Sequence, residues 1–68
     1  MSDDRAKKLG RMFKTTRFKL GMTQQDMATK AGLNISHYAK VERGELKASL
    51  ETLEKISKVL KLKLSDLL

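Results

Sequence analysis

The sequence contains no cysteine, no proline, no tryptophan and only one histidine. A chain without cysteine has no disulfide, no thiol nucleophile and no cysteine-based metal site. One histidine does not make a ligand cluster, so we expect neither a metal nor another cofactor. No apolar run approaches the roughly 20 residues of a membrane span, and no apolar segment typical of a secretory signal follows the N-terminal residues. We therefore expect a cytoplasmic protein that does not bind membranes.

The side-chain combinations of common active sites are missing as well. The sequence has no paired carboxylates, no activated serine and no glycine-rich loop that would hold a phosphate. A single histidine without a placed partner is not a catalytic site. We therefore expect that the protein is not an enzyme and that it has no small-molecule substrate.

Positive charge, in contrast, is in excess. The 68 residues include 15 Lys and Arg against 8 Asp and Glu, which leaves a formal net charge of +7. Such a surface attracts polyanions, nucleic acid first and anionic membrane second, although a basic surface can also be merely solvated. A chain of this length with 40% hydrophobic residues forms one small domain. We expect that domain to span residues 1–68.

The stretch from Gln24 to Arg43 has the pattern of two short helices that meet at a glycine. Thr23 and Asn34 carry side chains that can cap the N-termini of these helices. Gly32 lies where the chain leaves the first of them, and glycine adopts the left-handed conformation there at little cost. The apolar residues expected to pack the two helices together are Met27, Ala28, Ala31, Leu33, Tyr38 and Val41. This layout is typical of a helix-turn-helix, whose second helix enters the major groove of DNA.

Helical spacing continues on both sides of this stretch. A first helix is expected to begin with a cap at residues 2–4 and to end at Gly21. Gly10 inside it is expected to weaken the helix by about 1 kcal/mol relative to alanine. Ser49 caps a fourth helix and Ser65 a short final one, which makes five helices. The apolar positions of the two longer helices are Ala6, Leu9, Phe13 and Leu20, and Leu50, Leu53, Ile56 and Leu60.

The segment from Arg17 to Gly44 resembles the Xre/Cro-type helix-turn-helix family, the fold of lambdoid phage repressors. The residues that carry the resemblance are Gly21, Thr23, Gln24, Ala28, Gly32, Glu42, Arg43 and Gly44. Residues 49–53 and 64–68 are similar to the last two helices of that family. The resemblance implies an all-α, five-helix, lambda repressor-like DNA-binding domain that regulates transcription as a repressor or an autoregulator. The length also fits the restriction–modification controller proteins of this family, and a phage repressor or an antitoxin fits as well.

By this resemblance, the start of the second helix of the motif contacts the bases of double-stranded DNA. The residues concerned are Asn34, Ile35, Ser36 and Lys40. Lysine can donate to guanine, serine can donate or accept, and isoleucine can pack on a thymine methyl group. Phosphate contacts, which position a protein without reading sequence, are expected from Thr23, Gln24, His37, Arg43 and Lys47. For Gln24 and His37 the alternative is an exposed side chain without a DNA partner.

Four positions depart from the usual residues of the family, one of them Ala48, which stands where a proline is frequent. Ile35 replaces a polar residue, so it either contacts a thymine methyl or fills space against the sugar wall of the groove. Tyr38 replaces an aliphatic core residue, and we expect it to pack with its hydroxyl at the rim of the core. Lys61 replaces a glycine, which makes the end of the fourth helix less sharp.

The resemblance also implies an ion pair between Arg17 and Glu42, which would tie the first helix to the end of the reading helix. The alternative is two unconnected surface charges. Because a domain this small reads only a few base pairs, we expect a homodimer on a two-fold operator. The residues expected at the dimer interface are Leu46, Val59, Leu62, Leu64, Leu67 and Leu68. The alternative function is a helical protein-interaction module whose basic face binds an acidic partner.

Overall fold

The structure is a computed structural model that describes residues 4–68. In this part of the chain it contains four α-helices and one 3₁₀ helix, and no strand. The elements are α1 (Asp4–Lys19), α2 (Gln24–Ala31), α3 (Ile35–Glu42), α4 (Leu50–Leu60) and the 3₁₀ helix η1 (Leu64–Asp66). The all-α prediction is therefore confirmed, but the count of five is not, because the fifth element is a single 3₁₀ turn. The cap expected at Ser2 and Asp3 lies outside the described residues.

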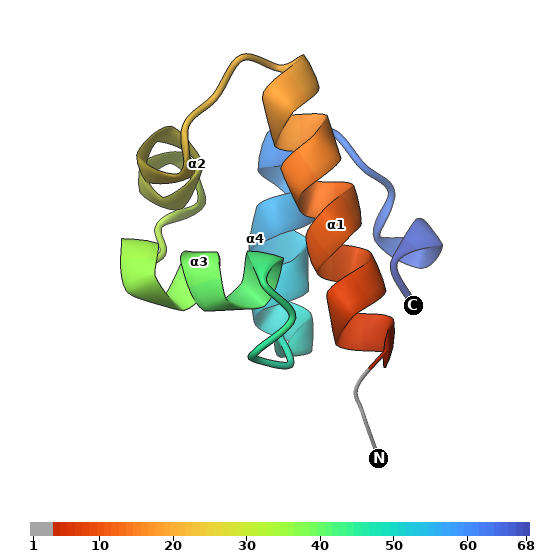
Figure 1. Cartoon of the computed structure of the whole chain (residues 1–68). Coiled ribbons are helices and arrows are strands. Elements are labelled where there is room, and N and C mark those ends of the chain that lie inside the picture. The colour runs from red at the N-terminus through yellow and green to blue at the C-terminus, as the bar shows by residue number, and fades with distance from the viewer. Residues whose placement is uncertain (1–3) are drawn as a thin grey trace.

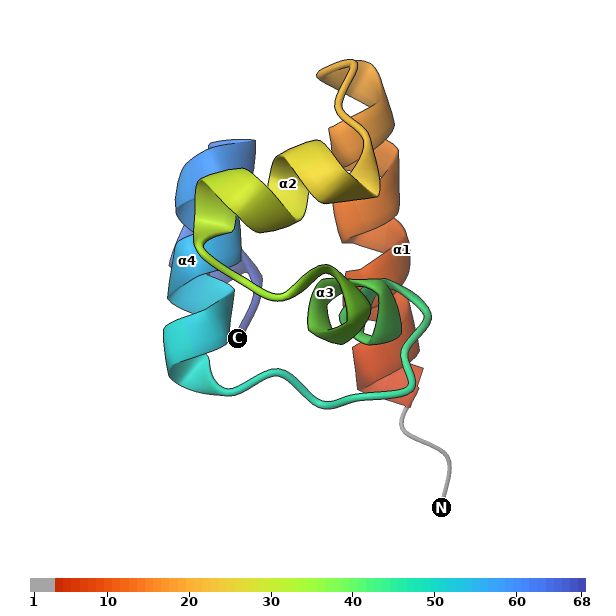
Figure 2. The same cartoon turned by 90° about the vertical axis from the view of Figure 1, so that its left-hand side faces the viewer.

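The helices α2 and α3 lie across one side of the pair formed by α1 and α4 (Figures 1 and 2). Helix α3 packs against both α1 and α2, and α2 packs against α4. The C-terminal segment with η1 lies on the opposite side of the molecule from α2 and α3 (Figure 1). The helix-turn-helix therefore has a face of its own, which the C-terminal segment does not cover.

The core is a cluster of apolar side chains contributed by all four α-helices and by the C-terminal segment. Its buried members are Phe13, Met27, Ala28, Ala31, Tyr38, Val41, Leu53, Ile56, Leu60 and Leu67. Leu20, which helical spacing assigned to the core, is 46% exposed because α1 ends one residue before it. The last buried position of α1 is occupied by Arg17 instead.

Gly10 allows α1 and the end of α3 to come into direct contact. A Cβ atom at this position would collide with the main-chain carbonyl oxygen of Glu42 and lie 2.7 Å from that of Val41. These are backbone atoms, so a side chain here would force the two helices apart. Gly10, expected only to weaken the first helix, therefore sets the distance between α1 and α3.

The C-terminal segment folds back onto α4. Helix α4 ends at Leu60, and its C-cap, Lys61, adopts the left-handed conformation with φ 58° that glycine usually occupies at this position. The turn of η1 is closed by i→i+3 bonds, among them one of 2.9 Å from the Leu67 amide to the Leu64 carbonyl. The residue at its N-cap is Lys63, so the expectation that Ser65 caps this turn was wrong. This turn inserts the Leu67 side chain into the core, where it is 2% exposed.

Candidate nucleic-acid interface

The start of α3 forms an exposed ridge. Asn34 has extended backbone angles and caps the helix, because its Oδ1 accepts hydrogen bonds from the Ser36 amide at 2.8 Å and the His37 amide at 3.3 Å. The side chains of the ridge are exposed to solvent, Ile35 to 38%. The exposed residues of the ridge are Asn34, Ile35, Ser36, His37 and Lys40. Four of them are the residues expected to contact bases, and the fifth, His37, is expected to contact a phosphate.

The cap also determines which hydrogen bonds Asn34 can still offer. Its carbonyl oxygen is used by two amides of α3, whereas its Nδ2 has no hydrogen-bond partner within residues 4–68. Asparagine recognises adenine by donating and accepting at the same time, which requires both groups. In this conformation Asn34 can act toward DNA only as a donor.

The start of α2 is built by a reciprocal capping box. The Thr23 Oγ1 accepts from the Asp26 amide at 3.0 Å, and the Thr23 amide donates to the Asp26 Oδ2 at 3.0 Å. The bond from the Thr23 amide holds the pKa of Asp26 below its usual value, so this carboxylate stays charged. Asp26 therefore places one negative charge beside the N-terminus of α2.

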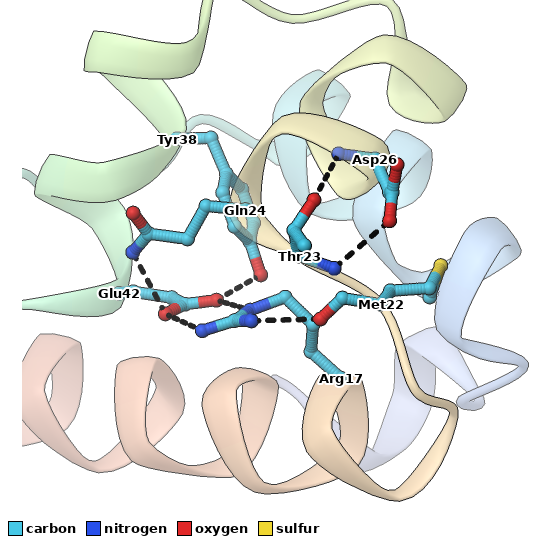
Figure 3. Close-up of polar contacts among 7 residues, drawn as sticks. All are labelled: Arg17, Met22, Thr23, Gln24, Asp26, Tyr38 and Glu42. Carbon is cyan, nitrogen blue, oxygen red and sulfur yellow. Dashed lines mark hydrogen bonds and ion pairs between the residues drawn. The ribbon is translucent and has the colours of Figure 1, made fainter.

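A buried polar network links α1, α2 and α3 (Figure 3). Arg17 donates from Nε to Glu42 Oε2 at 2.6 Å and from Nη2 to Oε1 at 3.1 Å. Its Nη1 donates to the main-chain carbonyl of Met22 at 2.8 Å. The same carboxylate accepts from Gln24 Nε2 at 3.1 Å and from the Tyr38 hydroxyl. The structure therefore joins Arg17 and Glu42, the two residues expected to pair, and adds two further donors to Glu42.

The network keeps Glu42 charged inside the protein. Burial alone would raise the pKa of Glu42, but the hydrogen bonds from Arg17, Tyr38 and Gln24 outweigh it and lower the pKa. Burial, followed by the bond to Glu42, raises the pKa of the Tyr38 hydroxyl, which stays protonated as a donor. The expectation that this hydroxyl lies at the rim of the core was wrong. The ring of Tyr38 is buried in the core. Because Tyr38 precedes Glu42 by one helical turn, its hydroxyl reaches the carboxylate from inside the protein.

Gln24, expected to contact a phosphate, belongs to this network. One amide hydrogen of its side chain is directed to Glu42, and the side chain is half-buried. The residue therefore couples the N-terminus of α2 to the end of α3. Phe18 was not among the expected site residues; it is 61% exposed, and the centroid of its ring lies 4.7 Å from the guanidinium carbon of Arg17. An exposed phenylalanine next to a buried arginine leaves no periodic signal in the sequence.

Two further expected phosphate contacts, Arg43 and Lys47, follow α3 and are exposed. Arg43 is not free in this structure, because it forms a two-bond ion pair with Glu45 at 2.8 Å and 3.2 Å. Glu45 was not among the expected site residues. Its position two residues after Arg43 in a loop carried no helical spacing that would have indicated the contact.

The expected dimer residues are divided by the fold. Leu67 is buried in the core of its own chain, so its assignment to the dimer interface was wrong. The physical reason is the turn of η1, which directs this side chain inward. Leu46, Val59, Leu62 and Leu64 are half-buried against the same core. Leu68 is 66% exposed and lines, together with exposed Leu50, a pocket of about 260 Å³. The other lining residues come from α1, from the loop before α4, from α4 and from the C-terminal segment.

Other kinds of site find no support in the described residues. No group of three or more His, Cys, Asp or Glu residues between positions 4 and 68 could hold a metal ion. In the same range, no helix has the length and apolar character needed to cross a membrane.

The structure has a helix-turn-helix with an exposed second helix, α3, which the buried Arg17–Glu42 ion pair ties to α1. This arrangement is that of a DNA-binding regulator of transcription. Comparison with known families agrees, because residues 13–67 match the family described as Helix-turn-helix. The chain belongs to this family, which confirms the resemblance to Xre/Cro-type, lambda repressor-like domains.

Among solved structures, the chain is similar to the restriction-modification controller protein C.AhdI from Aeromonas hydrophila. The two share 28% sequence identity with a TM-score of 0.86, over 93% of this chain and 96% of that chain. No curated protein sequence gave a significant match.

Proposed function

We propose that the protein is a sequence-specific, controller-type regulator that binds a two-fold operator as a homodimer. The observation that carries this proposal is the exposed ridge at the start of α3, held from behind by the buried network around Glu42. The network fixes α3 against α1 and α2, so the ridge forms a rigid reading surface, which base recognition requires. The similarity to C.AhdI, a restriction-modification controller protein of nearly the same extent, supports the controller-type role.

Base reading falls on four residues of the ridge, Lys40, Ser36, Ile35 and Asn34. Lys40 donates to guanine, Ser36 donates or accepts, and Ile35 packs on a thymine methyl group. Asn34 contributes a single donor hydrogen bond, because its oxygen is used by the helix cap. The spacing of Ser36 and Lys40 by one helical turn brings both to the same line of the exposed face.

Phosphate contacts surround this reading surface. The N-terminus of α2, with the Thr23 hydroxyl and the second amide hydrogen of Gln24, faces one strand, since unpaired helical amides attract anions. Arg43 and Lys47 face the other strand from beyond the C-terminal end of α3. His37 adds a contact at the edge of the ridge. These contacts orient α3 in the groove, and they make affinity depend steeply on salt.

The dimer forms through the apolar surface on the C-terminal side. Leu50 and Leu68 are 53% and 66% exposed and border the pocket, whose other apolar lining includes Leu9 and Leu53. Burial of these side chains against a second copy removes apolar surface from water. Leu46, Val59, Leu62 and Leu64, which keep partly exposed edges, complete the contact. Two copies related in this way read half-sites about 10 base pairs apart.

Selection of bound sequences from random duplex DNA tests the proposal. We expect an enriched sequence with two-fold symmetry and half-sites one helical turn apart. Sedimentation at micromolar concentration should give a dimer, and Leu68→Lys should shift it toward monomer. Recovery of DNA without any shared sequence would overturn specific recognition. Binding that lacks a steep dependence on salt would favour a protein-interaction module instead.

A further inference from the structure

Glu45 occupies a position between two cations of the proposed DNA-binding surface. Its carboxylate accepts hydrogen bonds from the Nε and the Nη2 of Arg43, at 2.8 Å and 3.2 Å. Guanidinium groups use the same two-bond geometry for phosphate. The positive charge of Lys40, a proposed base contact, also stabilises this carboxylate and contributes to lowering the pKa of Glu45. An acid is therefore located where a DNA phosphate would otherwise be expected.

The backbone holds Glu45 at this position. Its amide donates to the Lys40 carbonyl at 2.9 Å, and the Gly44 amide donates to the Val41 carbonyl at 3.1 Å. This is the Schellman ending of a helix, which requires the left-handed residue that Gly44 provides with φ 74°. Gly44 in turn lies directly against Lys7 of α1, where a Cβ atom would approach the Lys7 Cα to 2.7 Å. The main chain at Glu45 is thus held at the C-terminal end of the reading helix, with its carboxylate on Arg43.

We propose that Glu45 is an internal competitor for DNA phosphate, whose carboxylate holds Arg43 in the free protein and must release it on binding. This inference rests on the proposed DNA-binding function and deepens it. Arg43 cannot present its Nε–Nη2 edge to Glu45 and to a phosphate at the same time. A phosphate that takes this edge therefore has to open the ion pair, whereas the Nη1 side of the guanidinium stays available in either state. In the proposed contact the phosphate takes the Nε–Nη2 edge, so Glu45 lowers the affinity for any duplex and the free protein offers one fewer cation to neutralise phosphate.

The experiment compares the full chain with Glu45→Gln in binding to a short fluorescent duplex of random sequence, over a series of salt concentrations. Glutamine keeps the size of the side chain but removes the charge that competes with phosphate. We expect roughly two- to fivefold tighter binding, the range of an exposed ion pair. The log–log slope against salt should become steeper by about 0.9, which corresponds to one more phosphate contact.

Glu51→Gln is the matched control. Glu51 is an exposed carboxylate on α4 that also pairs with a cation, Lys55, at 3.5 Å, and its substitution changes the net charge by the same amount. Glu45→Gln should exceed this control in both affinity and salt slope. Equal effects of the two substitutions, with wild-type binding intact, would overturn the inference but leave the proposed function. Absence of wild-type binding at low salt would overturn both.

A second comparison separates competition for Arg43 from simple repulsion of DNA by the Glu45 charge. In the Arg43→Gln background, Glu45→Gln should have much less effect on affinity than in the wild-type chain, because no guanidinium remains to be released. A gain of the same size in both backgrounds would show through-space repulsion and would overturn the competition. Both residues are exposed, so we expect all variants to keep the wild-type melting temperature within a few degrees.

Discussion

Arg17→Met is the sharpest test of how the reading helix is held in place. The Arg17 and Glu42 side chains are 7% and 2% exposed, so the substitution leaves a buried carboxylate without its cation while keeping an apolar stem at position 17. Removal of one partner of a buried ion pair costs about 3–5 kcal/mol. A chain of this length is stabilised by roughly 3–10 kcal/mol in total. We therefore expect the melting temperature to fall by at least ~10 °C.

Thermal unfolding followed by circular dichroism measures this effect, with Lys14→Met as the control. Lys14 is an exposed residue one turn before Phe18 on the same helix, and its loss should change the melting temperature little. A fall for Arg17→Met no larger than that for Lys14→Met would refute the reasoning. It would mean that the network around Glu42 contributes no more than an exposed surface charge.

The dependence on pH gives a second, independent readout of the same network. The pKa of Glu42 in the folded protein lies below its ordinary value of 4.5, so the unfolded chain binds more protons in the range between the two values. The pair therefore stabilises the wild type fully above that ordinary pKa, and this stabilisation is lost as the pH falls through the folded pKa. In Arg17→Met the carboxyl can take up a proton more readily. The difference in melting temperature between the two proteins should thus narrow in acid, and a constant difference would contradict this account.

Three further substitutions test other parts of the structure. Gly10→Ala should destabilise the fold by about 1–3 kcal/mol despite the better helix propensity of alanine, because its Cβ meets the backbone of α3; urea unfolding measures it, and a stabilised variant would disprove the close contact. Lys61→Gly should stabilise the fold by about 0.5–1 kcal/mol, since it relieves the left-handed lysine at the end of α4; an unchanged midpoint would show that this residue is not strained. Lys40→Ala should keep the wild-type melting temperature but relax base preference in a randomised operator library, and unchanged selectivity would remove Lys40 from the reading set.

Short-range signals in the sequence were sufficient for the helix-turn-helix itself. Thr23 and Asn34 cap α2 and α3 as expected, and Gly32 has the expected left-handed conformation with φ 68°. Each of these features depends on residues within four positions of one another, so the chain encodes them locally. The same holds for the exposure of the ridge, because polar residues on the outer side of an amphipathic helix have no core to enter.

Only the tertiary structure decided which residues meet across the fold. Gly10 touches the end of α3, Leu67 enters the core rather than a dimer interface, and the Tyr38 hydroxyl reaches Glu42 inside the protein. These outcomes depend on how far apart the helices pack and on where the C-terminal turn folds back, neither of which helical periodicity specifies. The sequence by itself therefore determined the local form of the reading unit. Packing between distant segments determined how rigidly that unit is held, and which of the surrounding side chains remain exposed to contact DNA or a second copy.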